Sequence, residues 1–377
     1  MRIVVVQYRF HPNTRGWVEG LQARGHEVRM LVWRGPAPSE DWTGVDVRIV
    51  PPMPRVSRLL ARVLRVKAER DARVPRLRLL VHELRRARTD AVLLKQERLA
   101  SVVVSLVALG LGVRRVMWSN HPEKFARRYG LWSLLLRGGV LPRRRFFTTT
   151  QHPGALGDPT ARVSGAPFIP YAPVARQVRK ADSDPRSGWP VRLLTIGRIG
   201  QERKRASWTL EAAQRAGVLD GRVTFTFVGT GDETRPGYRE LARLAEKYGC
   251  ADRLVAHFDV PHRDMSEIFA AHDLLVAPAR DEPFGMVVVE AMAHGLAVIC
   301  SDTAGAQSCV VPEETGLVFS SSSADDLAAK LRSLVDDPRR VQAMGQRGRE
   351  VVEEFASPDV VARQIDALVR DRLPRRR

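Results

Sequence analysis

The stretch that decides the fold is Glu282-Pro-Phe-Gly-Met-Val-Val-Val-Glu290-Ala-Met-Ala-His-Gly295, which places two carboxylates eight positions apart around a glycine. The apolar run 274–278 before it and the run 297–300 after it are typical of buried parallel strands. Between them the pattern predicts a helix that ends at Gly295. Glu282 then lies in a strand-to-helix loop, and Glu290 on about the second turn of the helix. In an open α/β sheet this edge binds ligands, so two acids beside a free helix N-terminus indicate a polyhydroxylated, anionic ligand.

The alternation of strand and helix patterns continues through the whole chain, which predicts the α/β class with parallel strands and right-handed crossovers. The polar, Pro- and Gly-rich stretch 181–190 indicates a linker. We therefore expect two doubly wound, Rossmann-like domains, 1–180 and 181–355, facing each other across a cleft. A C-terminal helix within 356–377 is expected to pack back toward the first domain. The expected strands are 2–7, 27–32, 45–49, 91–94, 115–118, 191–197, 224–228, 254–258, 273–277, 297–300 and 316–319.

The composition is that of a folded, reduced protein. The 377 residues are 44% apolar and 27% charged, which suits two domains with cores of their own. The three cysteines form no C-x-x-C pair, which argues against a disulfide framework and a zinc site. Residues 2–7 already resemble a first strand, so no signal peptide is visible, and we expect a cytoplasmic location. The apolar run 99–113 falls short of the roughly 20 residues that span a bilayer, and predicts a buried helix.

The positive charge is concentrated in the first half of the chain. Residues 1–180 carry 34 Lys and Arg against 12 Asp and Glu, whereas the remainder carries 27 against 30. Such a field attracts phosphates, anionic membrane surfaces or nucleic acid. An arginine-rich composition with solvated faces is the alternative. The absence of helix-turn-helix, zinc-finger and RNP signatures makes nucleic acid the weaker candidate.

Two segments of the basic half, 55–67 and 76–88, combine arginines with an apolar face. Helices of this kind lie on anionic lipid surfaces, although they also pack on their own domain. We expect peripheral contact with the inner face of the membrane, and an acceptor that is lipid-linked or otherwise anionic.

A cationic pair is expected at the ligand edge of the second domain. Arg198 ends the strand that begins at Val191, and Lys204 follows just before a helix. Cations in a loop next to a helix N-terminus suit a diphosphate, whose charge grows as it leaves. Solvated surface charges are the alternative for each of these residues taken alone.

These positions together resemble glycosyltransferase family 4, a retaining family with the GT-B fold. The run from Glu282 to Gly295 resembles its E-x7-E signature, and Gly197-Arg198 with Lys204 resembles its donor-phosphate motif. Further similarities are Phe227-Val-Gly-Thr-Gly231, Ala277-Pro278 and Glu314-Thr-Gly-Leu-Val318. The resemblance covers roughly 191–335 and is weaker over the first half.

The resemblance implies a division of duties on the donor side. Glu282 would contact hydroxyls of the transferred sugar, and Glu290 would hold the ribose of the nucleotide. Arg198 and Lys204 would bind the diphosphate and stabilise the leaving group. The remaining donor-binding positions are Phe284, Gly285, Met286 and Val287, the last three through their backbone.

The resemblance also implies residues of the first domain. His121, just after a strand, would be the catalytic-face histidine, and His11, Asn13 and Arg15 would lie on the acceptor side. Two departures stand out. Phe10–Gly16 lacks the Gly-Gly pair of many members, and Ser308 replaces an acid that is common after 304–307.

The expected function is metal-independent, retaining transfer of a hexose-type sugar from a nucleotide diphosphate to an unidentified lipid, glycan, glycoconjugate or natural-product acceptor. No cofactor is expected besides the nucleotide sugar, whose base is open between UDP, GDP, ADP and dTDP. The alternatives are a GT-B epimerase or phosphorylase, and a non-catalytic protein that binds anionic surfaces.

Overall fold

The computed structural model describes residues 1–10, 14–36, 40, 42–63, 74–95, 99–120, 146–150, 169–174, 190–280, 282 and 284–370. Within these residues the chain divides into two compact units. It passes from the first unit to the second after Ala172 and returns to the first after Ser357.

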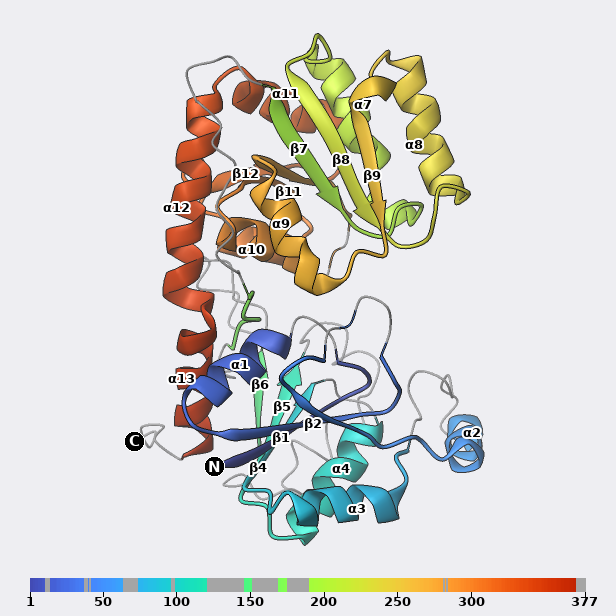
Figure 1. The fold of residues 1–377 in the computed structure, drawn as a ribbon, viewed down its shortest axis with the longest axis vertical. Coiled ribbons are helices and arrows are strands. Elements are labelled where there is room, and N and C mark those ends of the chain that lie inside the picture. Colours follow the sequence, from blue (N-terminus) through green and yellow to red (C-terminus); the bar gives the residue numbers. More distant parts are fainter. Residues whose placement is uncertain are drawn as a thin grey trace. The chain divides into compact units, whose positions relative to one another are not determined.

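The first unit is built on a parallel sheet of six strands in the order β3-β2-β1-β4-β5-β6 among the described residues (Figure 1). The strands are β1 (Arg2–Gln7), β2 (Glu27–Val32), β3 (Asp46–Ile49), β4 (Ala91–Lys95), β5 (Arg115–Asn120) and β6 (Phe146–Thr150). Its helices are α1 (Arg15–Ala23), α2 (Pro54–Val63), α3 (Leu77–Arg86), α4 (Leu99–Gly110) and α13 (Pro358–Val369).

Alternate residues of the strands pack into two separate hydrophobic cores, because successive side chains of a strand point to opposite faces. Ile3 and Val5 of β1 share a cluster with residues of α1 and α13. Val4 and Val6 share another with residues of α3 and α4. Both faces of the sheet are therefore covered by helices, as a parallel sheet requires.

Helix α13 is a structural part of the first unit. Gly20 of α1 allows this packing, because a Cβ there would stand 2.1 Å from the backbone oxygen of Pro358. Val361, Ala362 and Ile365 are fully buried in the cluster that includes α1. Residues 169–172 are bound to α1, because the Trp17 indole of that helix donates to the Pro170 carbonyl at 2.9 Å.

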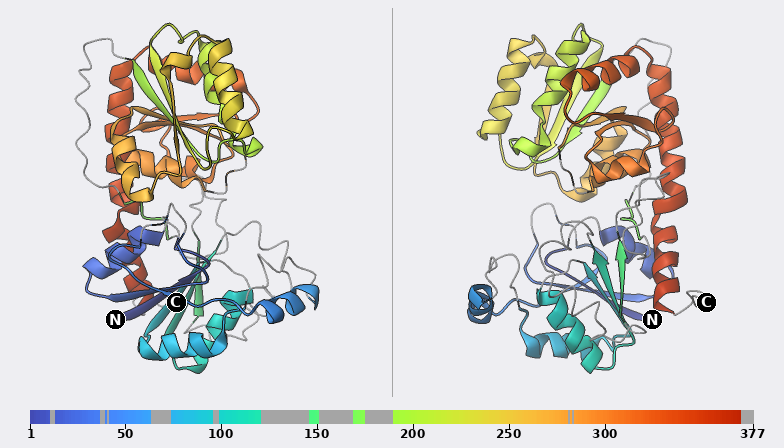
Figure 2. Two further views of the ribbon diagram at one scale, coloured as in Figure 1. Left: turned by 45° about the vertical axis from the view of Figure 1, so that its right-hand side comes forward. Right: turned by 180° about the vertical axis from the view of Figure 1, so that it is seen from behind.

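The second unit repeats the plan with the strand order β12-β11-β10-β7-β8-β9, all parallel (Figure 2). The strands are β7 (Val191–Ile196), β8 (Val223–Gly229), β9 (Leu254–Phe258), β10 (Leu274–Ala277), β11 (Ala297–Ser301) and β12 (Gly316–Phe319). The helices are α7 (Ser207–Ala216), α8 (Pro236–Lys247), α9 (Met265–Ala270), α10 (Met286–Ala293), α11 (Ala324–Val335) and α12 (Pro338–Ala356). Short 3-10 turns are η2 (Glu202–Lys204), η3 (Ala251–Arg253), η4 (His262–Asp264) and η5 (Gly305–Cys309).

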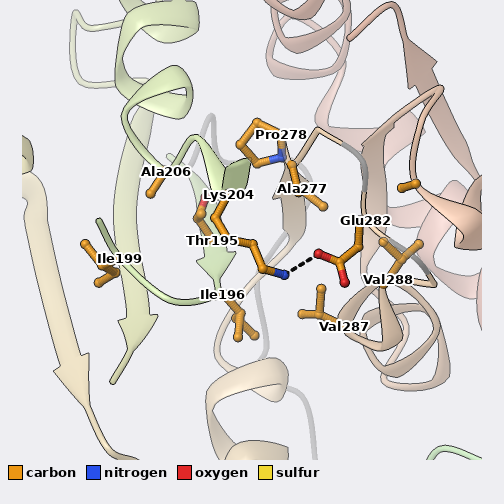
Figure 3. A pocket seen from close by; sticks show the side chains of 14 residues that line it. Thr195, Ile196, Ile199, Lys204, Ala206, Ala277, Pro278, Glu282, Val287 and Val288 are labelled. Carbon is orange, nitrogen blue, oxygen red and sulfur yellow. Dashed lines mark hydrogen bonds and ion pairs between the residues drawn. The ribbon is translucent and has the colours of Figure 1, made fainter. Parts of the chain in front are cut away.

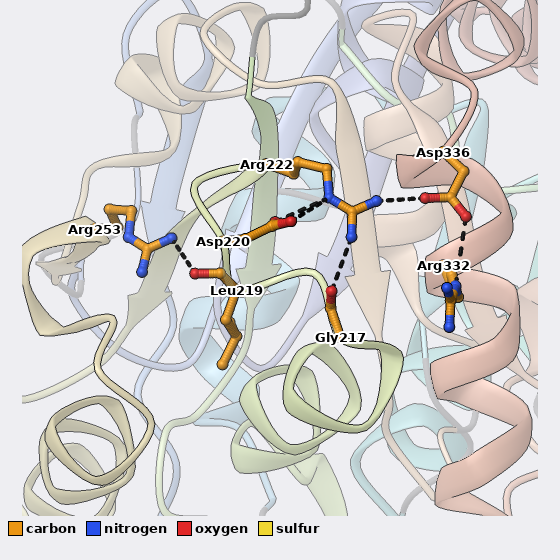
Figure 4. A network of polar contacts seen from close by, with 7 residues as sticks. All are labelled: Gly217, Leu219, Asp220, Arg222, Arg253, Arg332 and Asp336. Atoms are coloured by element: carbon orange, nitrogen blue, oxygen red, sulfur yellow. Dashed lines mark hydrogen bonds and ion pairs between the residues drawn. The ribbon is translucent and has the colours of Figure 1, made fainter.

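A polar network lies at the amino edge of this second sheet, opposite the edge that carries the loop of Glu282 (Figure 4). Arg222, directly before β8, donates to Asp220 at 2.9 Å, to the Gly217 carbonyl at 2.8 Å and to Asp336 at 2.5 Å. The network joins the ends of α7 and α11 to the start of β8. These hydrogen bonds are exposed and hold the loops at the amino edge of the sheet, away from the carboxyl edge where ligands bind in such folds.

The expected strands are present within one or two residues at each end, and each unit is a parallel α/β domain as predicted. The prediction missed β6, whereas the separate C-terminal helix expected within 356–377 corresponds to α13. Ser357 precedes a proline and is extended at φ −60° and ψ 151°, because a residue before proline avoids the helical region. The run expected at 99–113 forms the shorter α4.

No helix among the described residues combines the length and apolar character that crossing a bilayer requires. All three cysteines are buried and unpaired, and burial raises the pKa of Cys300 and of Cys309 to about 12, so both thiols stay protonated.

Candidate active site

The loop between β10 and α10 is held in one shape by its neighbours and by a glycine. Phe284 is buried, and the Glu282 carbonyl accepts a hydrogen bond from the Gly305 amide at 3.0 Å. Gly285, the N-cap of α10, has φ 91° and lies so close that an added Cβ would stand 3.3 Å from Glu282 Cγ. A left-handed position under such crowding favours glycine. Residues 304–306 therefore stabilise the loop that carries Glu282, through the hydrogen bond from the Gly305 amide.

The Glu282 carboxylate is the centre of an ion-pair cluster at the carboxyl edge of the second sheet. Its Oε2 accepts from Lys204 Nζ at 2.6 Å and from Arg203 Nη1 at 2.8 Å. Burial would raise the pKa of Glu282, but the hydrogen bonds and charges of Lys204 and Arg203 outweigh it and lower the pKa below its ordinary value. Glu282 is therefore ionised at neutral pH and neutralises part of the positive charge beside it.

The turn that carries Lys204 is fastened on both sides. The Arg280 amide donates to the Arg203 carbonyl at 2.7 Å, which ties η2 to the acidic loop. Arg205, left-handed at φ 48°, donates to the Ser321 carbonyl and lies 4.1 Å over the Trp208 ring. These contacts hold the Lys204 side chain over the pocket.

A small pocket opens between β7, β10 and the N-terminus of α10, and the Lys204–Glu282 pair spans it (Figure 3). Its floor is apolar and backbone-rich, and the first turn of α10 reaches its edge. Amides of a helix's first turn have no partner within the helix and attract anions. The lining residues are Thr195, Ile196, Gly197, Ile199, Lys204, Ala206, Ala277, Pro278, Ala279, Glu282, Gly285, Val287, Val288 and Ala304.

Four of the predicted donor residues line this pocket, namely Lys204, Glu282, Gly285 and Val287. The other four do not. Arg198 is exposed at the end of β7, and its guanidinium has no ion-pair partner in the part of the chain that the structure describes. Phe284 is buried beneath the loop, Met286 is half-buried on α10, and Glu290 lies on the next turn.

Glu290 has a partner that sequence reasoning missed. His262 Nε2, in the turn after β9, lies 3.3 Å from Glu290 Oε1. The helix that carries Glu290 is fixed by His294, whose Nδ1 contacts the Glu290 carbonyl at 2.7 Å and whose Nε2 lies 3.1 Å from Ser266 Oγ. Burial lowers the pKa of His294, so its ring stays neutral. No sequence motif marks His262, and its proximity to Glu290 becomes visible only in the folded chain.

The predicted residues of the first unit are placed less fully. His121, His11 and Asn13 lie outside the described residues. Arg15 begins α1 and is buried, with its guanidinium bonded to Glu19 at 2.6 Å and to the Thr43 carbonyl at 3.0 Å. Among the described residues no group of three or more His, Cys, Asp or Glu could hold a metal ion.

Comparison with known proteins places this site in a family context. Residues 182–351 match the family described as glycosyl transferases group 1. Glycogen synthase of Mycobacterium tuberculosis (strain CDC 1551 / Oshkosh) is 32% identical over 44% of this chain and 39% of its own length. D-inositol 3-phosphate glycosyltransferase of Rhodococcus opacus (strain B4) is 29% identical over 51% of this chain and 43% of its own. The chain thus spans about two fifths of these curated relatives.

Solved structures match along almost the whole chain. The Anabaena HepE complex with UDP gives a TM-score of 0.72 at 14% identity, covering 98% of this chain and all of its own. Sucrose-phosphate synthase from Thermosynechococcus elongatus gives 0.67 at 19% identity, with 98% of each chain covered. The fold of two parallel-sheet α/β domains is the GT-B fold, as the sequence predicted.

Proposed function

Because residues 182–351 match the family described as glycosyl transferases group 1, we propose that this protein transfers a sugar from a nucleotide diphosphate donor to an acceptor hydroxyl. The observation that carries the proposal is the Lys204–Arg203–Glu282 cluster beside the first turn of α10. It combines cations for a diphosphate, amides for phosphate or sugar oxygens, and a carboxylate that accepts from sugar hydroxyls. The family-level match and the site chemistry support the same reaction class.

The ion pair that spans the pocket suggests two successive states of the site. Without a donor, Lys204 is paired with Glu282. A bound diphosphate competes for the lysine, and the released carboxylate then accepts hydrogen bonds from the sugar. As the bond between the anomeric carbon and the phosphate oxygen breaks, negative charge grows on that oxygen. Lys204, with Arg198 approaching from the edge of β7, stabilises this charge, which is the form of catalysis that preorganised cations supply.

Further assignments follow the same proposal. Glu290 holds ribose hydroxyls with His262 as its neighbour, and the first unit carries the acceptor, with His121 facing the donor sugar. Transfer proceeds with retention of configuration, so a product proton spectrum would show the anomeric configuration of the donor. The donor carries one of four nucleosides, namely uridine, guanosine, adenosine or deoxythymidine.

A thermal-shift screen of UDP-, GDP-, ADP- and dTDP-sugars tests donor binding, because a ligand that binds the native state raises stability by mass action. At about 100 times its dissociation constant a donor stabilises by roughly 2.7 kcal/mol. We expect one base to raise the melting temperature in the wild type and not in Lys204→Met. Equal shifts in both proteins would contradict the role of Lys204.

We also propose that the basic first unit contacts the inner face of an anionic membrane through α2. Leu59 and Val56 of this helix are 62% and 38% exposed, between the exposed Arg55, Arg58 and Arg62. Co-sedimentation with phosphatidylglycerol vesicles at low salt should fall on Leu59→Ser. It should not fall on Leu106→Ser, which changes a leucine that is 53% exposed on α4. Equal binding by both variants and the wild type would contradict this surface.

A further inference from the structure

A second polar cluster lies in the first unit, at the carboxyl ends of β1 and β2. Arg9 follows β1, Arg34 follows β2, and Glu40 lies further along the same loop. The strand order reverses between β1 and β4, and doubly wound sheets bind ligands at such a reversal, on the carboxyl side. The cluster therefore borders the place where this fold holds a ligand.

Glu40 has an unsatisfied carboxylate oxygen. Its side chain is 0% exposed, and Oε1 receives no hydrogen bond from the described residues. The nearest cationic nitrogens are Arg9 Nη1 at 3.7 Å and Arg34 Nη2 at 3.9 Å, distances that leave the pairs without a hydrogen bond. The other oxygen accepts from the Trp42 indole at 3.3 Å. Buried carboxylate oxygens are normally satisfied, so an open one here points to a missing donor.

The two arginines are accessible although the acid is not. Their side chains are 29% and 44% exposed, and Arg34 also lies 5.6 Å over the Tyr8 ring. Two guanidinium groups against one carboxylate leave one net positive charge at the cluster. Guanidinium forks match the geometry of a phosphate. If the two guanidinium groups bind a phosphate, they move away from Glu40 Oε1. An ionised carboxylate oxygen only accepts hydrogen bonds, so Oε1 is then available to a donor such as a hydroxyl.

We propose that Arg9, Arg34 and Glu40 form the acceptor subsite, and that the acceptor is a phosphorylated polyol. The arginines bind its phosphate and Glu40 accepts from a hydroxyl close to that phosphate. The proposal rests on the proposed glycosyl transfer, which requires an acceptor hydroxyl in this unit. The phosphate belongs either to a free polyol phosphate or to a lipid headgroup, and the two sources share the chemistry that the cluster recognises.

Calorimetric titration of the full chain tests the subsite with glycerol 3-phosphate, inorganic phosphate and glycerol. We expect glycerol 3-phosphate to bind more tightly than the other two. The double variant Arg9→Gln/Arg34→Gln should weaken it about tenfold or more, the equivalent of roughly 1.4 kcal/mol. Arg48→Gln is the matched control, because Arg48 is an exposed arginine of β3 that lies 2.9 Å from Asp46. It should bind the probe as the wild type does.

Glu40→Gln separates the phosphate contact from the hydroxyl contact. The amide keeps the shape and removes the negative charge, so inorganic phosphate should bind at least as tightly as in the wild type. The preference for glycerol 3-phosphate over inorganic phosphate should fall. This variant keeps the test sharp even if the double arginine variant unfolds, which circular dichroism would reveal.

Vesicles of phosphatidylglycerol and of phosphatidylcholine distinguish the two sources. Binding of soluble glycerol 3-phosphate indicates a free acceptor, and binding of phosphatidylglycerol vesicles alone, lowered by Arg9→Gln/Arg34→Gln, indicates a lipid-linked one. The proposal is overturned if no phosphorylated probe binds the wild type, or if the arginine variants bind like Arg48→Gln. A donor that shifts the melting temperature while these probes fail would refute the subsite alone. The reverse result would refute the transferase function alone.

Discussion

The ammonium group of Lys204 pairs with Glu282 in the structure, and we propose that it binds the donor diphosphate during turnover. Replacement by methionine keeps the aliphatic stem and removes the charge. We predict that Lys204→Met lowers kcat/KM by about 100-fold or more, the usual loss when one preorganised donor to a developing negative charge is removed. Initial rates of nucleotide release measure it.

Lys247→Met is the control for that loss, since Lys247 is exposed at the end of α8 and contacts Tyr248. A similar decline in both variants would show that the effect comes from general loss of charge.

A pH dependence of stability follows from the lowered pKa of Glu282. The ionised carboxylate contributes stability that is present above its unfolded pKa of about 4.3 and is lost as the pH falls through the lower folded value. Burial raises the pKa of Glu282, and without Lys204 only Arg203 opposes that effect, so the folded pKa of Glu282 rises. The difference in free energy of unfolding between wild type and Lys204→Met should therefore be largest at neutral pH and shrink in acid. Urea titrations between pH 7 and 3 measure it, and a pH-independent difference would contradict the pairing.

Sequence patterns identified the charged residues of the pocket more readily than their partners. Glu282 and Lys204 lie in recognisable loops, so their positions could be predicted. Arg203 and His262 have no motif of their own. The turn η2 of Arg203 follows β7, which pairs with β10, and the turn η4 of His262 precedes α9, so both pairings arise only in the folded chain. Arg15 could not be placed from its loop, because its partners Glu19 and Thr43 become neighbours only when α1 forms.

At the scale of the element, the shape of the β10–α10 loop depends on Gly285. We predict that Gly285→Ala destabilises the protein by about 1–2 kcal/mol, because a left-handed alanine is strained, and also reduces activity, because its Cβ displaces Glu282. Gly217→Ala is the matched control. Gly217 is left-handed at φ 68° at the end of α7, and its added Cβ meets nothing within 4 Å. It should lose similar stability and keep its activity.

If both glycine variants lost activity to the same degree, strain alone would explain the effect and the close approach to Glu282 would not matter. Thermal unfolding and initial rates on the same preparations separate these outcomes.

The strands of the sheets could be predicted because each is a short apolar run bounded by turn residues. Strand β6 was missed, since Phe146-Phe-Thr-Thr-Thr150 is brief, shows no alternation and follows a run of arginines. The break between α12 and α13 lies within two residues of the expected boundary, because Ser357-Pro358 carries its signal.

At the scale of the whole molecule, the chain leaves the first unit and returns to it, and α13 completes the first core. We predict that Gly20→Ala destabilises the protein by about 1–3 kcal/mol, because its Cβ would overlap the Pro358 carbonyl and push α13 from α1. Gly110→Ala, at the end of α4, meets nothing within 4 Å and serves as the control. Limited proteolysis should release the C-terminal helix from the Gly20 variant first. Equal protection in the two variants would contradict the packing.

Composition and patterning could predict two parallel α/β domains, because both properties depend on local sequence. They could not predict the Arg9–Arg34–Glu40 cluster, whose members are ordinary loop residues in the sequence and meet only when β1 and β2 pair in register. The charge of the first half indicated an anionic partner, and the fold indicates where its phosphate would bind.

The activity that we propose for the Glu282 pocket is the turnover of a nucleotide sugar. Its most direct test is the release of nucleoside diphosphate from UDP-, GDP-, ADP- and dTDP-sugars by the wild type, Glu282→Gln and Glu246→Gln, where Glu246 is an exposed acid on α8. We expect turnover of at least one donor by the wild type and by Glu246→Gln, and about 100-fold less by Glu282→Gln. Undiminished turnover in Glu282→Gln, or none of any donor by the wild type, would contradict it.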